Sequence, residues 1–202
     1  VNRGKKSISI DLKTEKGKEL FLELAKEFDV IVENFTPGVM EKIGLSFDVI
    51  QSVNKKIIYA AISGYGQTGP WKDRPALDVI AQGSGGILSV TGEKDGPPIR
   101  PGTSLGDIGA GIYCVIGILS SIIERNKSGE GQFIDISMMD CQIAIQENAF
   151  MRWHLTGEEP QKLGTRHPTA VPFQAFPTAD GWIVVALSWG VPEQWNSNLT
   201  IH

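Results

Sequence analysis

Two short runs of apolar residues constrain the fold of this chain more than any other feature of its sequence. Residues 57–62 read Ile-Ile-Tyr-Ala-Ala-Ile, and residues 30–32 read Val-Ile-Val. A strand that is covered on both faces is apolar throughout, whereas a half-exposed strand alternates apolar and polar residues. Segments with apolar residues at helical spacing precede or follow each run. This order predicts an α/β domain built on a parallel sheet.

The remaining pattern divides the chain into two domains. Residues 1–155 are expected to form the large α/β domain, residues 156–177 a linker, and residues 178–202 the beginning of a small α+β domain. Hydroxyl residues that precede apolar periodic segments predict helix starts at Thr14, Ser46 and Ser137. Further strands are expected at residues 7–12, 133–136 and 182–187, and helices at 14–28, 37–44, 46–53, 77–88, 104–125 and 137–155.

Composition excludes several classes of partner. The net charge is -4, so the chain lacks the surplus of Lys and Arg that nucleic-acid binding requires. The longest near-apolar stretch, residues 108–123, is shorter than the ~20 residues of a membrane-spanning helix. Cys114 and Cys141 lie in apolar helical segments, which predicts buried, reduced thiols in a cytoplasmic protein. The three histidines have no metal-ligand spacing, so no metal site is expected.

A glycine-rich segment matches the residue spacing of a dinucleotide-binding motif but not the helix that must follow it. Residues 64–69 read Gly-Tyr-Gly-Gln-Thr-Gly. The dinucleotide fingerprint needs a helix that begins at these glycines, because the amides of its first turn hold the pyrophosphate. Pro70, Trp71 and Pro75 prevent such a helix, so NAD and FAD are not expected. Two interpretations stay open: a loop that shapes a pocket for another extended ligand, and a surface turn.

One acid stands among small residues at the start of the longest predicted helix. Residues 104–111 read Ser-Leu-Gly-Asp-Ile-Gly-Ala-Gly. Each glycine inside a helix costs ~1 kcal/mol relative to alanine, so Gly109 and Gly111 need a reason, such as the close approach of a ligand or of another backbone. Asp107 is either the third residue of a capping box begun by Ser104 or a nucleophile that small neighbours leave open to a substrate carbonyl. The helix dipole favours its ionised form in both cases.

Asp78 is the second acid of interest, just inside a predicted helix that follows Pro75. It is either an acid that complements the helix dipole or a pocket acid that assists proton transfer near Asp107. Asp140, three residues after Ser137, is interpreted as a second capping residue.

Several motifs occur in the order found in a known family. They are residues 2–8 (Asn-Arg-Gly-Lys-Lys-Ser-Ile), 32–38 (Val-Glu-Asn-Phe-Thr-Pro-Gly), 63–70 (Ser-Gly-Tyr-Gly-Gln-Thr-Gly-Pro), 129–135 (Gly-Glu-Gly-Gln-Phe-Ile-Asp) and the Asp107 stretch. Together they resemble the class III coenzyme A transferases, which include formyl-CoA transferase, carnitine-CoA transferases and bile-acid-inducible enzymes. The resemblance implies a Rossmann-like large domain plus a small domain, and a homodimer of interlinked rings. It also implies that the chain is an internal piece, without the first strand–helix unit and most of the small domain.

The resemblance also implies residue roles. Asp107 matches the catalytic aspartate, which forms a mixed anhydride and then an aspartyl-CoA thioester, so neither ATP nor a tightly bound cofactor is needed. Asp78 matches an acid near the nucleophile. The positions that contact CoA in formyl-CoA transferases are Ile10, Lys13, Asn34, Phe35, Lys42 and Met138 in this chain, and Lys42 replaces an Arg of the family.

The sequence departs from particular members of the family. A lysine near the site of formyl-CoA transferases is Pro75 here, and their glycine-rich lid is not recognisable, so formate and oxalate are not expected as substrates. The α-methylacyl-CoA racemases of the same superfamily have a histidine where this chain has Leu77. Racemase activity is the alternative enzymatic function. A non-catalytic CoA-binding fragment is the alternative for the isolated chain. The acyl donor and the acceptor acid stay unspecified.

Overall fold

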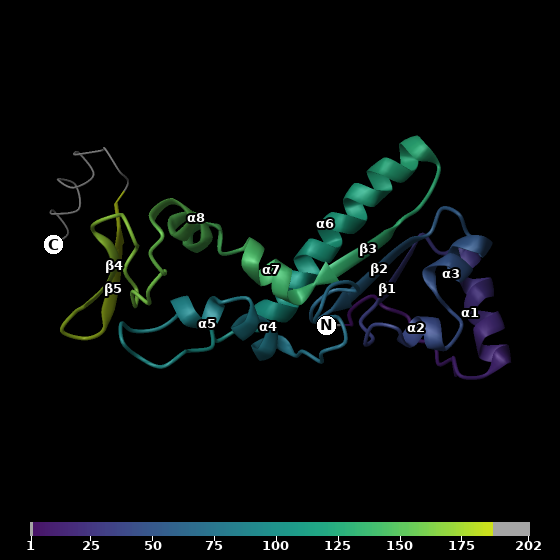
Figure 1. Cartoon of the computed structure of the whole chain (residues 1–202), viewed down its shortest axis with the longest axis horizontal. Coiled ribbons are helices and arrows are strands. Elements are labelled where there is room, and N and C mark those ends of the chain that lie inside the picture. Colours follow the sequence, from purple (N-terminus) through teal and green to yellow (C-terminus); the bar gives the residue numbers. More distant parts are fainter. Residues whose placement is uncertain (1, 188–202) are drawn as a thin grey trace. The chain divides into compact units, whose positions relative to one another are not determined.

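Three parallel strands form the central sheet in the computed structural model, which describes residues 2–187 (Figure 1). They are β1 (Val30–Glu33), β2 (Ile58–Ser63) and β3 (Phe133–Ser137), in the order β1-β2-β3. Val30 pairs with Ile58, and Tyr59 pairs with Phe133. The middle strand β2 is buried almost throughout, as its apolar run predicts. The structure confirms the predicted α/β class with a parallel sheet.

Alternate residues of β2 point into two separate cores. Tyr59 and Ala61 pack in a cluster with residues of α1 (Glu15–Glu27), α2 (Val39–Lys42) and α3 (Phe47–Val53). Ala60 packs in the other cluster, with residues of α4 (Asp78–Ser84), α6 (Leu105–Ser128) and α7 (Met138–Ala144). Because successive side chains of a strand point to opposite faces, helices cover both faces of this sheet. The arrangement is the layered one of α/β domains.

The three predicted hydroxyl caps are confirmed. Thr14 Oγ1 accepts a hydrogen bond from the Gly17 N–H at 3.1 Å, and Ser46 Oγ accepts one from the Val49 N–H at 3.4 Å. Ser137 Oγ accepts one from the Asp140 N–H at 3.2 Å, so the backbone of Asp140 is part of a helix cap. These bonds satisfy N–H groups that have no partner inside the helix.

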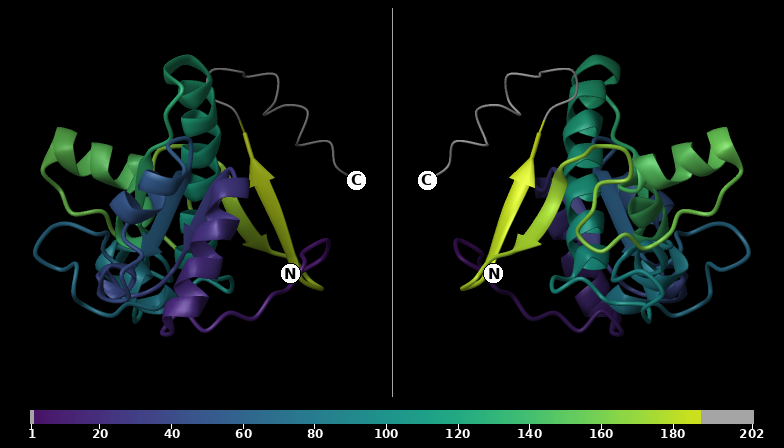
Figure 2. Two further views of the ribbon diagram at one scale, coloured as in Figure 1. Left: turned by 90° about the vertical axis from the view of Figure 1, so that its right-hand side faces the viewer. Right: turned by 90° about the vertical axis from the view of Figure 1, so that its left-hand side faces the viewer.

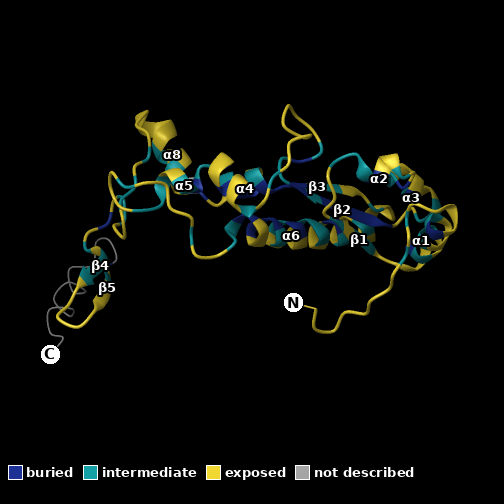
Figure 3. Ribbon diagram, turned by 90° about the horizontal axis from the view of Figure 1, so that it is seen from below, coloured by how far each residue is buried: buried dark blue, intermediate teal, exposed yellow. Residues whose placement is uncertain are grey.

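The longest described helix, α6, packs one side on the sheet and leaves the other side open. Ala110, Cys114 and Ser121 are buried, and the Ser121 hydroxyl accepts a hydrogen bond from Gln132 Nε2 at 2.5 Å. A stripe of apolar side chains on the open side, 48 to 61% exposed, consists of Ile108, Ile112, Val115, Ile116, Leu119 and Ile123. Figure 3 shows yellow, exposed residues along this helix.

The length of α6 exceeds the apolar stretch seen in the sequence, because the helix continues through charged residues to Ser128. Within residues 2–187 it is the one helix whose length and composition would suit a membrane crossing. A core helix of an α/β domain meets the same two criteria. Its contacts with β2, β3, α4 and α7 show that α6 serves as a core helix on one side.

Residues 86–102 and 146–187 belong to a second compact unit. It contains α5 (Ile87–Val90), α8 (Glu147–Thr156) and an antiparallel hairpin of β4 (Phe173–Pro177) and β5 (Trp182–Ala186), drawn as yellow arrows in Figure 2. The Gly164 N–H donates to the Gly92 carbonyl at 2.9 Å, and Lys162 Nζ donates to the Gly96 carbonyl at 2.7 Å. Segments far apart in the sequence therefore form one unit.

Several sequence-based expectations differ from the structure. Residues 7–12 form no strand, because no described strand pairs with them. The helix expected at 77–88 is divided, since Gly86 has a φ of 90° and cannot continue an α-helix. The helix expected at 137–155 is divided between α7 and α8. The expected linker at 156–177 contains β4, and the part of the expected small domain beyond residue 187 lies outside the described residues.

Candidate active site

Asp107 lies exposed in the first turn of α6. Ser104 is the N-cap residue, but its side chain makes no capping hydrogen bond, so the capping box considered from the sequence is not formed. Among the residues that the structure describes, the Asp107 carboxylate has no hydrogen bond or ion pair. It stands at the positive end of the dipole of a helix of 24 residues. The carboxylate is thus presented to solvent rather than used to hold its own helix.

The structure brings Asp78 against the residue that precedes Asp107. Asp78 lies in the first turn of α4, and its Oδ1 accepts a hydrogen bond from the Gly106 N–H at 2.8 Å. Gln82 Nε2 lies 2.9 Å from Oδ1 and 2.8 Å from Oδ2 of the same carboxylate. Asp78 is therefore near the predicted nucleophile through the backbone. Its role in proton transfer stays a prediction.

A second buried side chain reaches the same turn of α6 from α7. Gln142 is fully buried, and its Nε2 donates a hydrogen bond to the Leu105 carbonyl at 2.9 Å. Gln82 is also fully buried. Sequence reasoning missed both glutamines. The available signal was a polar residue inside an otherwise apolar helical segment, and it says nothing about the partner.

The glycines around Asp107 have separate structural reasons. A Cβ at Gly106 would lie 2.9 Å from the Asp78 carbonyl oxygen, and one at Gly109 would lie 3.0 Å from Gln142 Nε2. Nothing lies within 4 Å of the Cβ position of Gly111, one turn after Asp107 on the same face. Close approach of protein groups, one of the reasons expected from the sequence, therefore applies to Gly106 and Gly109. Gly111 leaves open space beside the carboxylate.

Three of the predicted CoA contacts lie at the carboxyl edge of the sheet, where open α/β sheets bind ligands. Asn34 and Phe35 directly follow β1, and Met138 directly follows β3. Asn34 Nδ2 donates to the Ile62 carbonyl of β2 at 2.6 Å. Phe35 is 48% exposed, whereas Met138 is a buried core residue at 6%. Phe35 is thus available to a ligand.

The other three predicted CoA contacts lie on different segments. Ile10 is half-buried, whereas Lys13 and Lys42 are exposed. Lys13 precedes α1, and its N–H donates to Asp11 Oδ1 at 3.0 Å. Within the described residues neither ammonium group has a hydrogen bond or ion pair. Both are available to phosphate groups, and their binding roles stay predictions.

The glycine-rich loop after β2 forms turns rather than a helix start. Gly66 has a φ of 82°, and the following N–H of Gln67 donates to Asp135 Oδ2 at 2.9 Å. The next helix, α4, begins only at Asp78, as the prolines predict. The loop borders a cavity of about 430 Å³ whose lining includes Tyr65, Trp71, Ser137 and Asp140. This geometry supports the pocket-shaping interpretation of the loop.

Burial raises the pKa of several titratable groups on the sheet and the helices packed on it, among them Glu33 and the two cysteines. It raises the pKa of Glu33, at the end of β1, although the Phe35 N–H that donates to this carboxylate at 2.6 Å acts in the opposite direction. Burial also raises the pKa of the Cys141 thiol to about 11, and it raises the pKa of Cys114. Both cysteines are free and buried, as predicted. Neither is an activated thiol.

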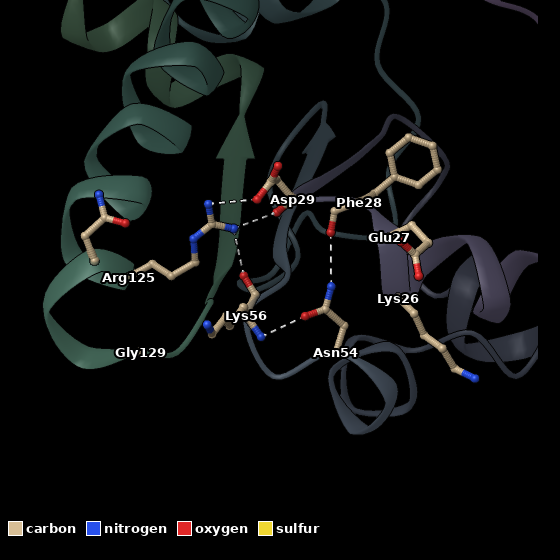
Figure 4. Close-up of a pocket in the computed structure, with 9 residues that line it drawn as sticks. Lys26, Glu27, Phe28, Asp29, Asn54, Lys56, Arg125 and Gly129 are labelled. Atoms are coloured by element: carbon tan, nitrogen blue, oxygen red, sulfur yellow. Dashed lines mark hydrogen bonds and ion pairs between the residues drawn. The ribbon is translucent and has the colours of Figure 1, made fainter.

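A polar cavity of about 480 Å³ lies at the opposite, amino-terminal edge of the sheet (Figure 4). The Arg125 guanidinium at the end of α6 donates to the carbonyls of Asp29 and Lys56 and pairs with Asp29 Oδ1 at 3.0 Å. Asn54 Nδ2 donates to the carbonyls of Ala25 and Phe28. These side chains satisfy loop carbonyls and tie α6 to the strand starts. The cavity is a structural junction.

The fold and the site define a class of protein: an α/β domain with a solvent-exposed carboxylate at the amino end of its longest described helix. The sequence matches the model of CoA-transferase family III over residues 1–201, and the chain belongs to this family. The resemblance inferred from the motifs is thereby confirmed.

Named relatives and a solved structure agree with this assignment. The chain is 44% identical to an acetyl-CoA:oxalate CoA-transferase of Acetobacter aceti and 42% identical to a succinate–glutarate CoA-transferase of Agrobacterium fabrum. The alignments cover 92 and 93% of this chain and 48 and 47% of those proteins. The solved structure of a CaiB/BaiF family protein from Brucella suis matches with a TM-score of 0.85 and 40% identity, over 92% of this chain and 49% of that one. The chain thus spans about half the length of the curated relatives it matches.

Proposed function

We propose that the whole protein transfers coenzyme A from an acyl-CoA to a carboxylic acid through Asp107. The observation that carries the proposal is an exposed, unpartnered carboxylate at the amino end of α6, in a chain that belongs to CoA-transferase family III. A nucleophilic carboxylate must be ionised and accessible, and the helix dipole and the open space beside Gly111 favour both.

The proposed chemistry conserves the activation of the thioester. The Asp107 carboxylate attacks the acyl carbonyl, the C–S bond breaks, and a mixed anhydride and the CoA thiolate form. The thiolate then attacks the aspartyl carbonyl, which releases the donor acid and leaves an aspartyl-CoA thioester. The acceptor carboxylate attacks this thioester to form a new anhydride, and the thiolate returns to its acyl carbon. N–H groups at the start of α6 can stabilise the oxyanions, and no tightly bound cofactor is required.

CoA is proposed to bind along the carboxyl edge of the sheet. Asn34 and Phe35 follow β1 and Met138 follows β3 at this edge, and the exposed Phe35 ring offers an apolar surface. Lys13 and Lys42 are proposed to supply positive charge for the phosphates. Lys42 cannot form the bidentate hydrogen bonds that an arginine makes to a phosphate. Ile10 completes the proposed contacts with CoA. Asp78 is not one of them and is the acid proposed to act beside the nucleophile.

Trapping of the covalent intermediate tests the proposal. Incubation of the whole protein with acyl-CoA and hydroxylamine should label Asp107, as mass spectrometry of peptides would show. Asp107→Ala should abolish the label and lower kcat at least about 10³-fold, since removing a nucleophile removes the pathway. Ser120→Ala, an exposed position of the same helix, is the matched control. An Asp107→Ala variant that transfers CoA at the normal rate would refute the proposal.

The alternative functions give different results. A racemase exchanges the α-proton with solvent deuterium without an acceptor acid, and it needs two bases. Leu77, at the position of the racemase histidine, is 77% exposed and carries no base. The isolated chain of 202 residues is proposed to bind CoA with low activity or none.

The whole protein is further proposed to be a cytoplasmic homodimer whose partners are small acids and acyl-CoA. Two free, buried thiols fit a reducing compartment. Light scattering of the whole protein and cell fractionation test these two statements.

A further inference from the structure

We infer that Asp78 and Gln142 clamp the peptide group between Leu105 and Gly106 and thereby orient Asp107. Gly106 N–H and Leu105 C=O belong to this one planar group. Asp78 Oδ1 accepts from its N–H at 2.8 Å, and Gln142 Nε2 donates to its C=O at 2.9 Å. The inference rests on the proposed function of Asp107 as nucleophile.

The two contacts approach the peptide group from different helices. Asp78 extends from α4 and Gln142 from α7, and both helices pack on α6. Gln82, one turn after Asp78, donates to both carboxylate oxygens and fixes their plane. A planar peptide group held at both its N–H and its C=O has little freedom to rotate about the line between the Cα atoms of Leu105 and Gly106. Fixing this peptide group also fixes the backbone of the following residue, and with it the direction in which the Asp107 side chain projects from α6.

The composition of this turn indicates a use beyond stability. Gly109 costs ~1 kcal/mol of helix stability at an interior position, and Gly106 and Gly109 are both small enough to let the clamping groups approach. Burying the amides of Gln82 and Gln142 is costly, and the hydrogen bonds of their Nε2 groups to Asp78 and to the Leu105 carbonyl offset part of this cost. Apolar side chains could hold α4 and α7 against α6 without burying polar groups. Such contacts are non-directional, so they would not fix the orientation of the peptide group. A misplacement of ~1 Å at a reacting group lowers rate ~10²-fold, so a defined angle affects catalysis directly.

Gln142→Met tests the clamp in the whole protein, because methionine keeps the length of the side chain and removes the donor. We expect kcat to fall about 10- to 100-fold while KM for acyl-CoA changes less than about twofold. Gln132→Met is the matched control: it removes a glutamine hydrogen bond to the same helix at Ser121, remote from Asp107, and should leave kcat unchanged. Thermal unfolding of both variants separates loss of folded protein from loss of rate.

Asp78 provides an independent test. Asn keeps an oxygen that accepts from the Gly106 N–H, and Gln82 Oε1, which has no hydrogen-bond partner among the described residues, can accept from its amide. Asp78→Asn should therefore recover most of the kcat that Asp78→Ala loses and keep the shape of the pH–rate profile. An Asn variant as slow as the Ala variant, or one with a displaced pH profile, would show that Asp78 acts through its ionisation and would overturn the inference.

The outcomes separate this inference from the proposed function. Absence of label on Asp107 in the unmodified protein refutes the proposed function. Normal labelling of Asp107 together with an unchanged kcat in Gln142→Met, or a rise in KM alone, refutes the clamp and leaves the proposed function intact.

Discussion

At the scale of single residues, two carboxylates illustrate how position decides chemistry. Asp107 is exposed at a helix start, whereas Glu33 is partly buried at the end of β1, where burial raises its pKa from 4.5. The neighbouring charge of Glu41 adds to this shift. Protonation of Glu33 is thus easier in the folded than in the unfolded chain. By linkage, its contribution to stability is complete below about pH 4.5 and is lost as the pH rises through the folded pKa.

Replacing Glu33 by glutamine should remove this dependence. The amide oxygen can still accept from the Phe35 N–H, and no buried charge remains. At about pH 7 we expect Glu33→Gln in the whole protein to unfold at a higher urea concentration than the unmodified protein. At about pH 4 the two midpoints should be equal. Glu19→Gln, at an exposed position of α1, is the control and should show no such divergence. A difference that does not depend on pH would contradict the assignment.

The residues that could be predicted from the sequence are those whose partner is near in the chain. Thr14 and Ser46 cap helices through residues three positions away, and the position of Asp107 at a helix start follows from Ser104, where the sequence predicts that helix to begin. Gln142 bonds a carbonyl 37 residues away, and Gly106 donates to a carboxylate 28 residues away. Only tertiary packing brings such groups together, so the clamp has no local sequence signal.

At the scale of elements, α6 combines an amino end that carries the proposed nucleophile with a body packed on the sheet. Its end at Gly129, with a φ of 80°, follows from the sequence, and so do the buried strands. The breaks after α4 and α7 do not follow from it. Gly85 and Gly86 are compatible with a weakened helix or with a break, and no glycine or proline marks the break at Ile145 and Gln146. Periodicity finds helices but does not fix where packing interrupts them.

Gly111→Ala tests whether the space beside Asp107 is used. The Cβ position is open, so alanine should stabilise α6 by up to ~1 kcal/mol. The added methyl group stands one turn from Asp107 on the same face, and we expect it to lower kcat/KM for acyl-CoA. Unfolding by urea and initial rates measure the two effects. Ser120→Ala, exposed near the far end of the helix, should gain stability without loss of rate. An unchanged kcat/KM in Gly111→Ala would show that substrate does not approach on this side.

At the scale of the whole molecule, the stripe of exposed apolar side chains on α6 has no explanation in the packing of the described residues. The side chains are about half exposed over most of the helix, and apolar surface of this extent is unusual on a protein that stays monomeric. The sequence predicted the helix but not the stripe, because buried and exposed Ile and Val look alike in a segment as apolar as residues 108–123. Only the packing of the opposite side on β3, with Gly117 against Ile134, identifies which side is covered.

The isolated chain of 202 residues should therefore associate with itself. We expect light scattering after gel filtration to give a mass above 22.0 kDa, together with binding of a hydrophobic dye. The double variant Val115→Lys with Leu119→Lys places two charges in the surface that association would bury. Burying them is costly, so the measured mass should fall toward that of one chain. Ser120→Lys adds charge outside the stripe and should change nothing. A monomeric isolated chain that binds no dye would mean that the side chains of the stripe are covered within the molecule, and the outer side of α6 would then be a second core rather than a surface.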